Sequence, residues 1–391
     1  MSAVATARSF DAVVIGVGGM GSAALYHLAR RGQRVLGLER FDIPHDLGSS
    51  HGLTRIIRLA YYEHPSYVPL LRRAYTLWRE LEALAGEPLL HLTGSIDAGP
   101  PGGPVFEGSR RSCLLHALPH EVLTAADLAR RYPGYALPAD TLAVLQPEGG
   151  YLRPERCVVA HVQGALDLGA EVHGRERVLG WDGGGAAGAF RVRSDRGAYA
   201  ARRLVVTAGP WAAALVPALD GLAVPERQVV AWFQPHRPEL FAPARFPVFN
   251  LAVPEGRYYG FPVSQVPGFK VGRYHHLEET VDPDAVDRTG SLRDEAVLRA
   301  FAERYFPAGA GPTLALRTCL FTNSPDEHFL IDRHPDAPEV VVAAGFSGHG
   351  FKFCSVVGEI LADLTVDGQT RHDVDLFRLA RFRPGPPPAG P

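Results

Sequence analysis

Four short runs of apolar residues predict strands that are buried on both faces of a sheet. They are FDAVVI from Phe10 to Ile15, RVLGL from Arg34 to Leu38, RLVVT from Arg203 to Thr207 and EVVVAA from Glu339 to Ala344. Their β-branched residues favour strands over helices. A glycine closely follows each of the last two runs. We expect these two to extend the sheet that the first two begin.

Apolar residues at helical spacing predict two helices. The first, Met20 to Arg31, lies between the first two strands, so the three elements form a βαβ unit. The second, Tyr67 to Leu84, is the clearest amphipathic helix of the chain. The stretches around 90–145 and 220–315 alternate in polarity and are interrupted by prolines, which is typical of a separate antiparallel sheet.

These elements predict an α/β chain with two domains, for which 391 residues are sufficient. A Rossmann-type dinucleotide-binding domain is expected to comprise residues 10–84, 151–218 and 316–382. A substrate domain is expected to comprise residues 85–150 and 219–315. We expect the tail 383–391, RPGPPPAGP, to be disordered because its prolines cannot continue a helix or a central strand.

Charge and cysteine content narrow the class of protein. Forty Lys and Arg stand against 42 Asp and Glu, a net charge of -2, so we expect binding neither to nucleic acid nor to an anionic membrane. The leader MSAVATARS has no continuous apolar segment, so no secretory signal is expected. The uncharged stretch from Ala12 to Ala29 has glycines in its middle, which indicate a turn rather than a membrane span. Four separate cysteines without a CxxC pair indicate reduced thiols and a cytoplasmic protein.

The glycine-rich turn GVGGMG gives the first indication of chemistry. Gly16, Gly18 and Gly21 follow a predicted strand and begin a predicted helix, and Glu39 ends the next strand, which is the pattern of a dinucleotide site. The glycines allow a tight turn, a close approach to a pyrophosphate and close packing of helix on strand. Glu39 can accept hydrogen bonds from ribose hydroxyl groups and would repel the 2'-phosphate of NADP. The motif does not separate FAD from NAD, although a second glycine-rich segment at Gly345 favours FAD.

Five segments resemble the monomeric sarcosine oxidase and N-methyltryptophan oxidase family and occur in the same order. They are GVGGMG, GSSHGLTRIIRLAYYEHPSYVPL from Gly48, GFKVG around Lys270, CLFTNSPDEHFLID from Cys319 and GFSGHGFKF from Gly345. The resemblance implies a glutathione-reductase-like FAD domain and a D-amino-acid-oxidase-like antiparallel substrate domain. It also implies a monomer that oxidises a small secondary amino acid to an imine, which hydrolyses to an amine and formaldehyde, while O2 becomes H2O2.

The resemblance implies roles for four residues. Cys319 matches the cysteine that carries FAD covalently, and a cation such as Arg317 would favour its thiolate. Lys270 matches the lysine that activates oxygen. Arg58 and Lys352 match the pair that holds the substrate carboxylate. The planar guanidinium of an arginine can donate two hydrogen bonds to a carboxylate, and the ammonium group of a lysine adds a second positive charge. Without the family pattern, these residues would be interpreted as ordinary surface charges and a small buried thiol.

Further residues match positions around the flavin and the substrate. The expected catalytic set is Lys270, Arg55, Arg58, Lys352, Tyr259, His51 and Glu63. The expected cofactor set is Gly16, Gly18, Gly19, Met20, Gly21, Glu39, Arg40, Ser49, Ser50, His51, Thr54, Arg55, Val178, Thr207, Ala208, Gly209, Trp211, Cys319, Gly345, Gly348, His349, Gly350, Phe351 and Lys352. A purely structural role explains His51 and Val178 equally well.

The chain departs from the family pattern in the substrate cavity. Phe321 stands where the family has a tyrosine, and either Tyr274 or His275 falls at the place of its active-site histidine. We therefore expect a substrate other than sarcosine itself.

Other interpretations of the sequence are less well supported. The cluster Asp326, Glu327, His328, Asp332 and His334 has neither HxxxH nor HExxH spacing, so no metal site is expected. The alternatives are an oxidase of a cyclic imino acid, a flavin amine dehydrogenase that uses an electron carrier, an NAD-dependent dehydrogenase and a non-catalytic flavin-binding protein.

Overall fold

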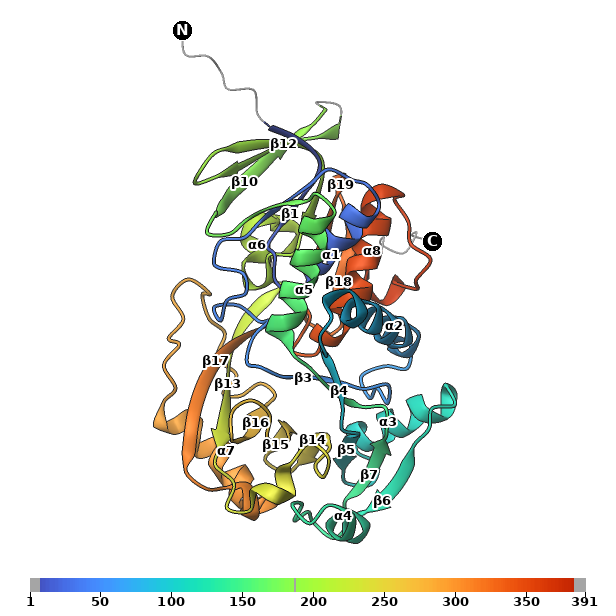
Figure 1. Ribbon diagram of the computed structural model, residues 1–391, viewed down its shortest axis with the longest axis vertical. Coiled ribbons are helices and arrows are strands. Elements are labelled where there is room, and N and C mark those ends of the chain that lie inside the picture. The colour runs from blue at the N-terminus through green and yellow to red at the C-terminus, as the bar shows by residue number, and fades with distance from the viewer. Residues whose placement is uncertain (1–7, 186–187, 383–391) are drawn as a thin grey trace, which may run out of the picture.

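The computed structural model describes residues 8–185 and 188–382, so the predicted tail 383–391 lies outside the described residues. Its strands form two eight-stranded sheets and one three-stranded sheet. The two large sheets lie at opposite ends of the molecule in Figure 1. The small sheet comprises β3 (Arg55–Ile57), β8 (Gly150–Leu152) and β4 (Leu90–Leu92).

The first large sheet contains the predicted βαβ unit. β1 (Arg8–Ile15) lies between β2 (Val35–Leu38) and β12 (Ala198–Val206) and is parallel to both. β19 (Ala337–Ala344) is parallel to the end of β12, so the four apolar runs are confirmed as strands of one sheet. The remaining strands are β9 (Glu171–His173), β10 (Val178–Gly183), β11 (Phe190–Ser194) and β18 (Leu330–His334).

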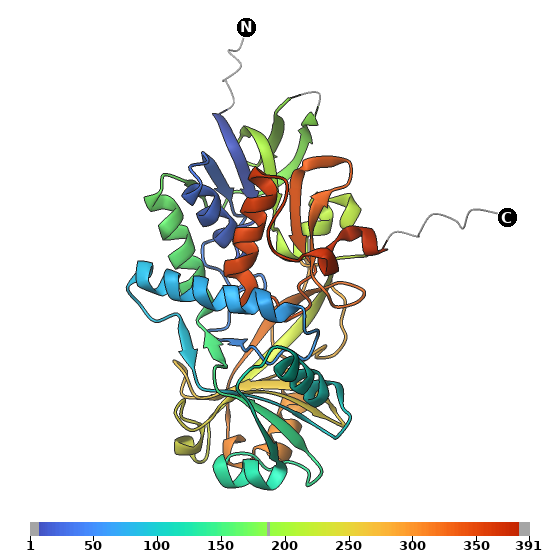
Figure 2. The ribbon, with the colours of Figure 1, turned by 90° about the vertical axis from the view of Figure 1, so that its right-hand side faces the viewer.

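Both faces of this sheet are buried, as its continuous apolar runs predict. In β1, Val14 belongs to the core shared with the long helices, whereas Val13 and Ile15 belong to a second core on the other face. The helices of the first core pack against one another beside the sheet (Figures 1 and 2). They are α1 (Gly19–Arg30), α2 (Tyr67–Ala85), α5 (Pro154–Asp167) and α8 (Cys354–Val366). The two predicted helices are thus confirmed.

The second large sheet has the order β17-β13-β16-β15-β14-β5-β7-β6. Its strands are β17 (Thr313–Asn323), β13 (Val224–Phe233), β16 (Phe269–Arg273), β15 (Gly256–Phe261), β14 (Val248–Val253), β5 (Ser95–Gly99), β7 (Leu142–Gln146) and β6 (Glu121–Thr124). The sheet is antiparallel as predicted, except that β14 and β5 are parallel. These two strands come from distant segments, so no hairpin fixes their relative direction. α3 (Pro104–Leu115), α4 (Ala125–Arg131) and α7 (Leu292–Tyr305) accompany the sheet.

β17 bears on one predicted domain boundary. It pairs with β13 from Thr313 to Asn323, with a register shift between Trp232 and Phe233, and Cys319 lies opposite Gln228 in this ladder. The strand therefore belongs to the second sheet, whereas the sequence analysis assigned residues from 316 onward to the dinucleotide-binding domain. The other domain boundaries stay predictions.

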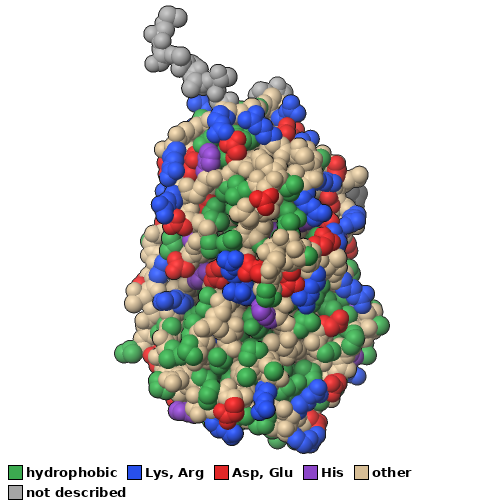
Figure 3. All heavy atoms as spheres, viewed as in Figure 1, with side chains coloured by type: hydrophobic (Ala, Val, Ile, Leu, Met, Phe, Trp, Pro, Cys, Tyr) green, Lys and Arg blue, Asp and Glu red, His purple; other side chains and the backbone are tan. Residues whose placement is uncertain are grey.

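The surface carries charges of both signs. On the face shown in Figure 3, Lys and Arg side chains are interspersed with Asp and Glu side chains, in keeping with the net charge of -2. Within residues 8–185 and 188–382, no helix is long and apolar enough to cross a membrane.

Candidate active site

An elongated cavity lies at the carboxyl ends of strands in the first sheet. Its lining includes Ile15 at the end of β1, Leu38 at the end of β2 and Ala344 at the end of β19. Ligands of open α/β sheets bind at such ends. The space between the lining residues, including the part that is open to solvent, amounts to about 1370 Å³. The lining extends from the glycine-rich turn before α1 to the glycine-rich segment after β19, a span that suits a long cofactor.

Most of the predicted cofactor residues line this cavity. They are Gly16, Gly18, Gly19, Met20, Glu39, Arg40, Ser49, Ser50, Arg55, Val178, Thr207, Ala208, Gly209, Trp211, Gly345, Gly348, Gly350 and Phe351. The predicted residues outside the lining are Gly21, His51, Thr54, Cys319, His349 and Lys352.

The glycine-rich turn has the geometry that a pyrophosphate requires. Gly16 has φ +90°, and a Cβ on Gly21 would lie 1.8 Å from the carbonyl oxygen of Gly16, so Gly21 serves packing rather than contact with a ligand. The N-terminus of α1 has neither a side-chain cap nor an acidic residue in its first turn. The N–H group of Gly19 donates to Oγ of Ser50 at 3.1 Å, and the partial positive charge and the remaining free N–H groups of the first turn are available to an anion. The buried Glu39 accepts hydrogen bonds from the backbone N–H groups of Val17 (2.8 Å) and Phe41 (3.0 Å).

The opposite end of the cavity is also shaped by glycine. Gly345 and Gly348 have φ of +59° and +77°, and a Cβ on Gly348 would lie 2.3 Å from the ring of Phe321. The buried Oγ1 of Thr322 lines the cavity and has no hydrogen-bond partner among the described residues. A buried hydroxyl group usually has a hydrogen-bond partner, so a ligand with a hydrogen-bonding group would be favoured here. Both ends of the cavity thus fit FAD.

The cavity is also lined by residues that were not predicted from the sequence. Among them are Glu176, Arg177, Pro210, Thr322, Ser347 and Cys354. The position of two of these residues in the sequence could have identified them as cofactor residues. Arg177 directly precedes the predicted Val178, and Ser347 lies between the predicted Gly345 and Gly348. Cys354 lies in the cavity wall, where burial raises the pKa of its thiol.

Cys319 lies beside a cation, but a different one from that expected. Nη2 of Arg55 is 3.5 Å from the sulfur of Cys319 and also donates to the carbonyl oxygen of Ser49 at 3.0 Å. Arg317, which the sequence suggested for this role, is exposed to solvent. The correction follows from the fold, because β3 brings Arg55 to the site from a distant segment.

Lys270 is buried, with its amine directed at the segment before β3. Its Nζ donates to the carbonyl oxygens of Gly52 (2.6 Å) and Thr54 (3.1 Å) and to Oγ1 of Thr54 (3.0 Å). Burial, and secondly Arg55, hold the pKa of Lys270 well below its usual value. Thr54 therefore positions Lys270 in this structure and does not line the cofactor cavity.

Arg58 and Lys352 come together around one aromatic ring. The guanidinium carbon of Arg58 is 4.5 Å and Nζ of Lys352 is 5.3 Å from the ring centroid of Tyr61. Nζ of Lys352 donates to the carbonyl oxygen of His349 at 2.6 Å. Burial, and secondly Arg58, lower the pKa of Lys352 to about 7. The pair predicted from the sequence is thus adjacent, although neither residue lines the cofactor cavity.

Arg58 has two carboxylate partners. It is 1% exposed, and its Nη2 donates to both carboxylate oxygens of Glu63 at 3.1 and 2.9 Å. Its Nε lies 3.4 Å from Oδ1 of Asp97, a residue that the sequence analysis did not consider. Burial opposes the charge on Arg58, but Asp97 and Glu63 raise its pKa above the usual value. Burial likewise opposes the charge on Glu63, but Arg58 lowers the pKa of Glu63 to about 2.

Aromatic rings lie between this charged group and the cofactor cavity. The guanidinium carbon of Arg58 is 4.3 Å from the ring centroid of Tyr62, and that of Arg257 is 5.6 Å from Tyr62 and 4.0 Å from Tyr274. The ring centroids of Tyr259 and Tyr274 are 5.1 Å apart, and those of Tyr274 and Phe321 are 6.0 Å apart. Phe321 lines the cofactor cavity. Of the two residues left open by the sequence, Tyr274 is therefore the one beside Tyr259.

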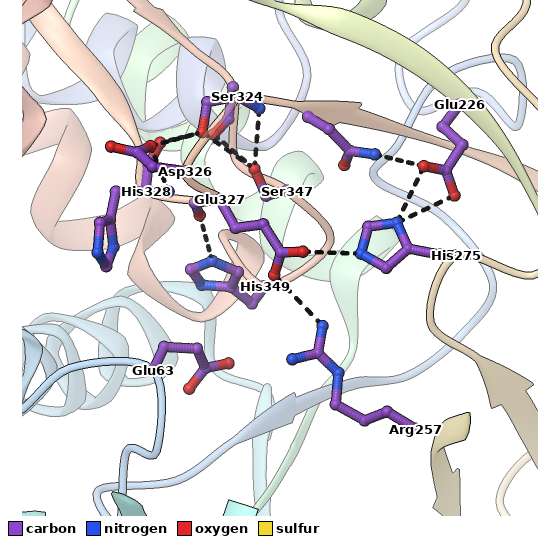
Figure 4. Close-up of polar contacts among 12 residues, drawn as sticks. Glu63, Glu226, Arg257, His275, Ser324, Asp326, Glu327, His328, Ser347 and His349 are labelled. Atoms are coloured by element: carbon purple, nitrogen blue, oxygen red, sulfur yellow. Dashed lines mark hydrogen bonds and ion pairs between the residues drawn. The ribbon is translucent and has the colours of Figure 1, made fainter. Parts of the chain in front are cut away.

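His275 instead joins an ionic cluster at the rim, shown in Figure 4. Its Nδ1 lies 2.9 Å from Oε2 of Glu226 and its Nε2 lies 2.9 Å from Oε1 of Glu327. These two carboxylates raise the pKa of His275 to about 9. Arg257 approaches Glu327 at 3.5 Å. Among the described residues, no group of three or more His, Cys, Asp or Glu side chains is arranged to hold a metal ion.

His51 and His349 are both buried and uncharged near neutral pH. Burial lowers the pKa of His51 to about 3 and that of His349 to about 4. His51 lines a separate surface pocket together with Glu155, and its Nε2 has no partner among the described residues. Nδ1 of His349 lies 2.5 Å from the hydroxyl oxygen of Tyr61, so His349 supports the ring between the two cations.

Comparison with known proteins agrees with this geometry. Residues 11–364 match the family described as FAD dependent oxidoreductase. The chain is 42% identical over 386 residues to a monomeric sarcosine oxidase of Streptomyces avermitilis, covering 97% of this chain and 99% of that protein. It is 36% identical over 376 residues to an N-methyl-L-tryptophan oxidase of Yersinia pestis, covering 96% and 100%.

A solved structure gives the same result for the fold. NikD, described as an unusual amino acid oxidase essential for nikkomycin biosynthesis, has a TM-score of 0.81 at 27% identity, covering 95% of this chain and 97% of that one. Because the matching family is FAD-dependent, these matches exclude the alternative of an NAD-dependent dehydrogenase. The chain belongs to the FAD dependent oxidoreductase family, as a flavin-dependent amine oxidase related to monomeric sarcosine oxidases and N-methyl-L-tryptophan oxidases.

Proposed function

We propose that this enzyme oxidises secondary amino acids of the N-methyl type, releasing formaldehyde and an amine and reducing O2 to H2O2. The observation that carries the proposal is the buried pair of cations, Arg58 and Lys352, around Tyr61. Arg58 is already paired with Glu63 and Asp97, whereas Lys352 has no carboxylate at ion-pair distance among the described residues and donates only to a carbonyl oxygen. A buried cation needs an anionic partner, and a substrate carboxylate would supply one to Lys352. The names of the relatives support the same substrate class.

The residues of the chain would orient the substrate, and bound FAD would accept the two electrons of C–N oxidation. Arg58 and Lys352 would hold the carboxylate, which fixes the amine at a set distance from the cofactor cavity. The wall of Tyr259, Tyr274 and Phe321 would exclude water. A cationic, dry surrounding lowers the pKa of an amine, so the substrate would bind with a neutral nitrogen.

Phe321 and Tyr274 support a substrate other than sarcosine itself. Phe321 carries no hydroxyl group toward the cavity, and the ring of Tyr274 fills the space beside Tyr259. We therefore propose an N-methyl amino acid with a side chain. A cyclic imino acid meets the same requirements, because it also combines a secondary amine with a carboxylate.

Lys270, Cys319 and Arg55 complete the proposal on the cofactor side. Lys270 would place positive charge where O2 becomes reduced. Cys319 would attach FAD covalently through its sulfur, which lies beside Nη2 of Arg55. We also propose a monomer, as in the names of the sarcosine oxidase relatives, and a cytoplasmic location, for which the four free cysteines argue.

Anaerobic titration with N-methyl and cyclic amino acids tests the substrate class. We expect the yellow purified protein to bleach with at least one N-methyl amino acid and, in air, to release H2O2 in equal amount to the amine product. The corresponding amines without a carboxylate should bleach it far more slowly. Bleaching without peroxide would instead indicate a dehydrogenase with an electron carrier, and no bleaching at all would indicate a non-catalytic flavin protein.

Lys270→Met tests the oxygen role. Removing one preorganised charge from a buried site typically slows a step by about 10²–10³-fold. We expect this loss in the reoxidation of the reduced enzyme by O2, whereas anaerobic reduction by substrate should change only a few-fold. Stopped-flow absorbance measures both rates. Equal slowing of the two would contradict an oxygen-specific role.

Cys319→Ser tests the covalent attachment. Acid precipitation of the wild-type protein should carry the yellow colour into the pellet, and that of Cys319→Ser should leave it in solution. Cys354→Ser is the matched control, because Cys354 is also buried and does line the cavity, so its loss should leave the colour in the pellet. Flavin that stays soluble in the wild type would refute the linkage.

The pKa of Lys352, about 7, predicts how carboxylate binding depends on pH. Lysine is charged below its pKa, so a ligand with a carboxylate but no amine should bind more weakly as pH rises through 7, by up to about tenfold per pH unit. The pKa values of His349 and His275, about 4 and about 9, lie outside this window. Spectral titration between pH 6 and 8 should show the step in the wild type and not in Lys352→Met. A constant affinity in the wild type would contradict the role of Lys352.

A further inference from the structure

The two carboxylates at Arg58 differ in how firmly they are held. Glu63 lies in the irregular segment between β3 and α2, whereas Asp97 lies in the middle of β5. Glu63 contacts the Nη2 edge of the guanidinium and Asp97 faces its Nε edge. A loop residue can yield its place to a ligand more readily than a residue within a sheet.

Asp97 is fixed from two further sides. It is 0% exposed. Its Oδ1 accepts a hydrogen bond from Nδ2 of Asn250 at 2.7 Å, and its Oδ2 accepts one from Oγ of Ser109 at 2.7 Å. Asn250 lies directly opposite Asp97 in the β14–β5 ladder, and Ser109 is a buried residue of α3. Burial raises the pKa of Asp97, while Arg58 and these two hydrogen bonds oppose the shift.

The register of the second sheet places Asp97 on the face that the site uses. Asn250 lies opposite Asp97 on one side and opposite Tyr259 on the other, and Tyr259 lies opposite Gly272. Residues directly opposite one another point to the same face of a sheet. Lys270, two residues from Gly272, shares this face. Asp97 therefore lies in one row with Asn250 and Tyr259, on the sheet face that carries Lys270, and the row continues to Val144 of β7.

The charges at Arg58 show why a fixed partner is needed. One guanidinium faces two carboxylates, so a substrate carboxylate can bind the Nη2 edge only when it takes the place of Glu63. During that exchange, Arg58 would be free to follow Glu63 unless its other edge were held. We propose that Asp97 is a positioning residue, which anchors the Nε edge of Arg58 so that its Nη2 edge is presented to the substrate carboxylate. This inference rests on the proposed function above.

Asp97→Asn in the flavin-loaded enzyme tests the inference. We expect KM for an N-methyl amino acid to rise about tenfold, the loss of one buried contact between opposite charges, while kcat changes by about twofold or less. The Kd of acetate, measured by its effect on the flavin absorbance spectrum, should rise by a similar factor. Turnover of a secondary amine without a carboxylate should keep its kcat/KM. An unchanged or lower KM and acetate Kd would overturn the proposal.

Asp294→Asn is the matched control. Asp294 is another fully buried carboxylate, paired with Arg227 at 2.9 Å outside the site, so its loss should reduce stability without changing KM or the acetate Kd. If Asp97→Asn does not fold, Ser109→Ala tests the same proposal. This substitution removes one hydrogen bond that holds Asp97 and should raise the acetate Kd by a smaller factor. No effect of Ser109→Ala would then overturn the proposal.

Activity and acetate binding together distinguish a failure of this inference from a failure of the proposed function. A wild-type enzyme that oxidises no N-methyl amino acid contradicts the proposed function, but its acetate titration still tests Asp97, since binding needs no turnover. A wild-type enzyme with the expected activity and an indifferent Asp97→Asn variant contradicts the role of Asp97 alone.

Discussion

The arrangement of the site depends on one buried guanidinium. Arg58 is almost wholly removed from solvent, and a charge at such depth is tolerated only when opposite charges and hydrogen bonds surround it. Glu63, Asp97 and the carbonyl oxygen of Ala60 meet this requirement. They come from a loop and from the second sheet, so the position of Arg58 links these two parts of the fold.

The segment from Gly48 to Glu63 connects the cofactor cavity with the proposed carboxylate site. Its first part, with Ser49 and Ser50, lines the cofactor cavity, and Arg55 reaches the sulfur of Cys319. Its last part carries Arg58 and Glu63 to the proposed carboxylate site. The cofactor cavity is formed mainly by the first sheet, whereas Lys270, Tyr259 and Asp97 belong to the second. Catalysis at their junction therefore requires both sheets to be in place.

The sequence predicted the parts of this structure that local patterns determine. Apolar runs identified the strands of the first sheet, and the glycine spacing with Glu39 identified the dinucleotide turn, because both patterns lie within a few dozen residues. Asp97 was missed because its partners are distant in the chain: Asn250 follows it by 153 residues. The choice between Tyr274 and His275 depended on the backbone. His275 has φ +50°, a left-handed turn after β16 that directs its ring to Glu226 and Glu327.

The central claim is that Arg58 and Lys352 receive the carboxylate of the substrate. A crystal structure of the flavin-loaded enzyme with a bound carboxylate ligand tests it most directly. We expect the ligand carboxylate to contact Nη2 of Arg58 and Nζ of Lys352, Glu63 to have left Arg58, and Asp97 not to have moved. A ligand bound elsewhere, with the Arg58–Glu63 pair intact, would contradict it.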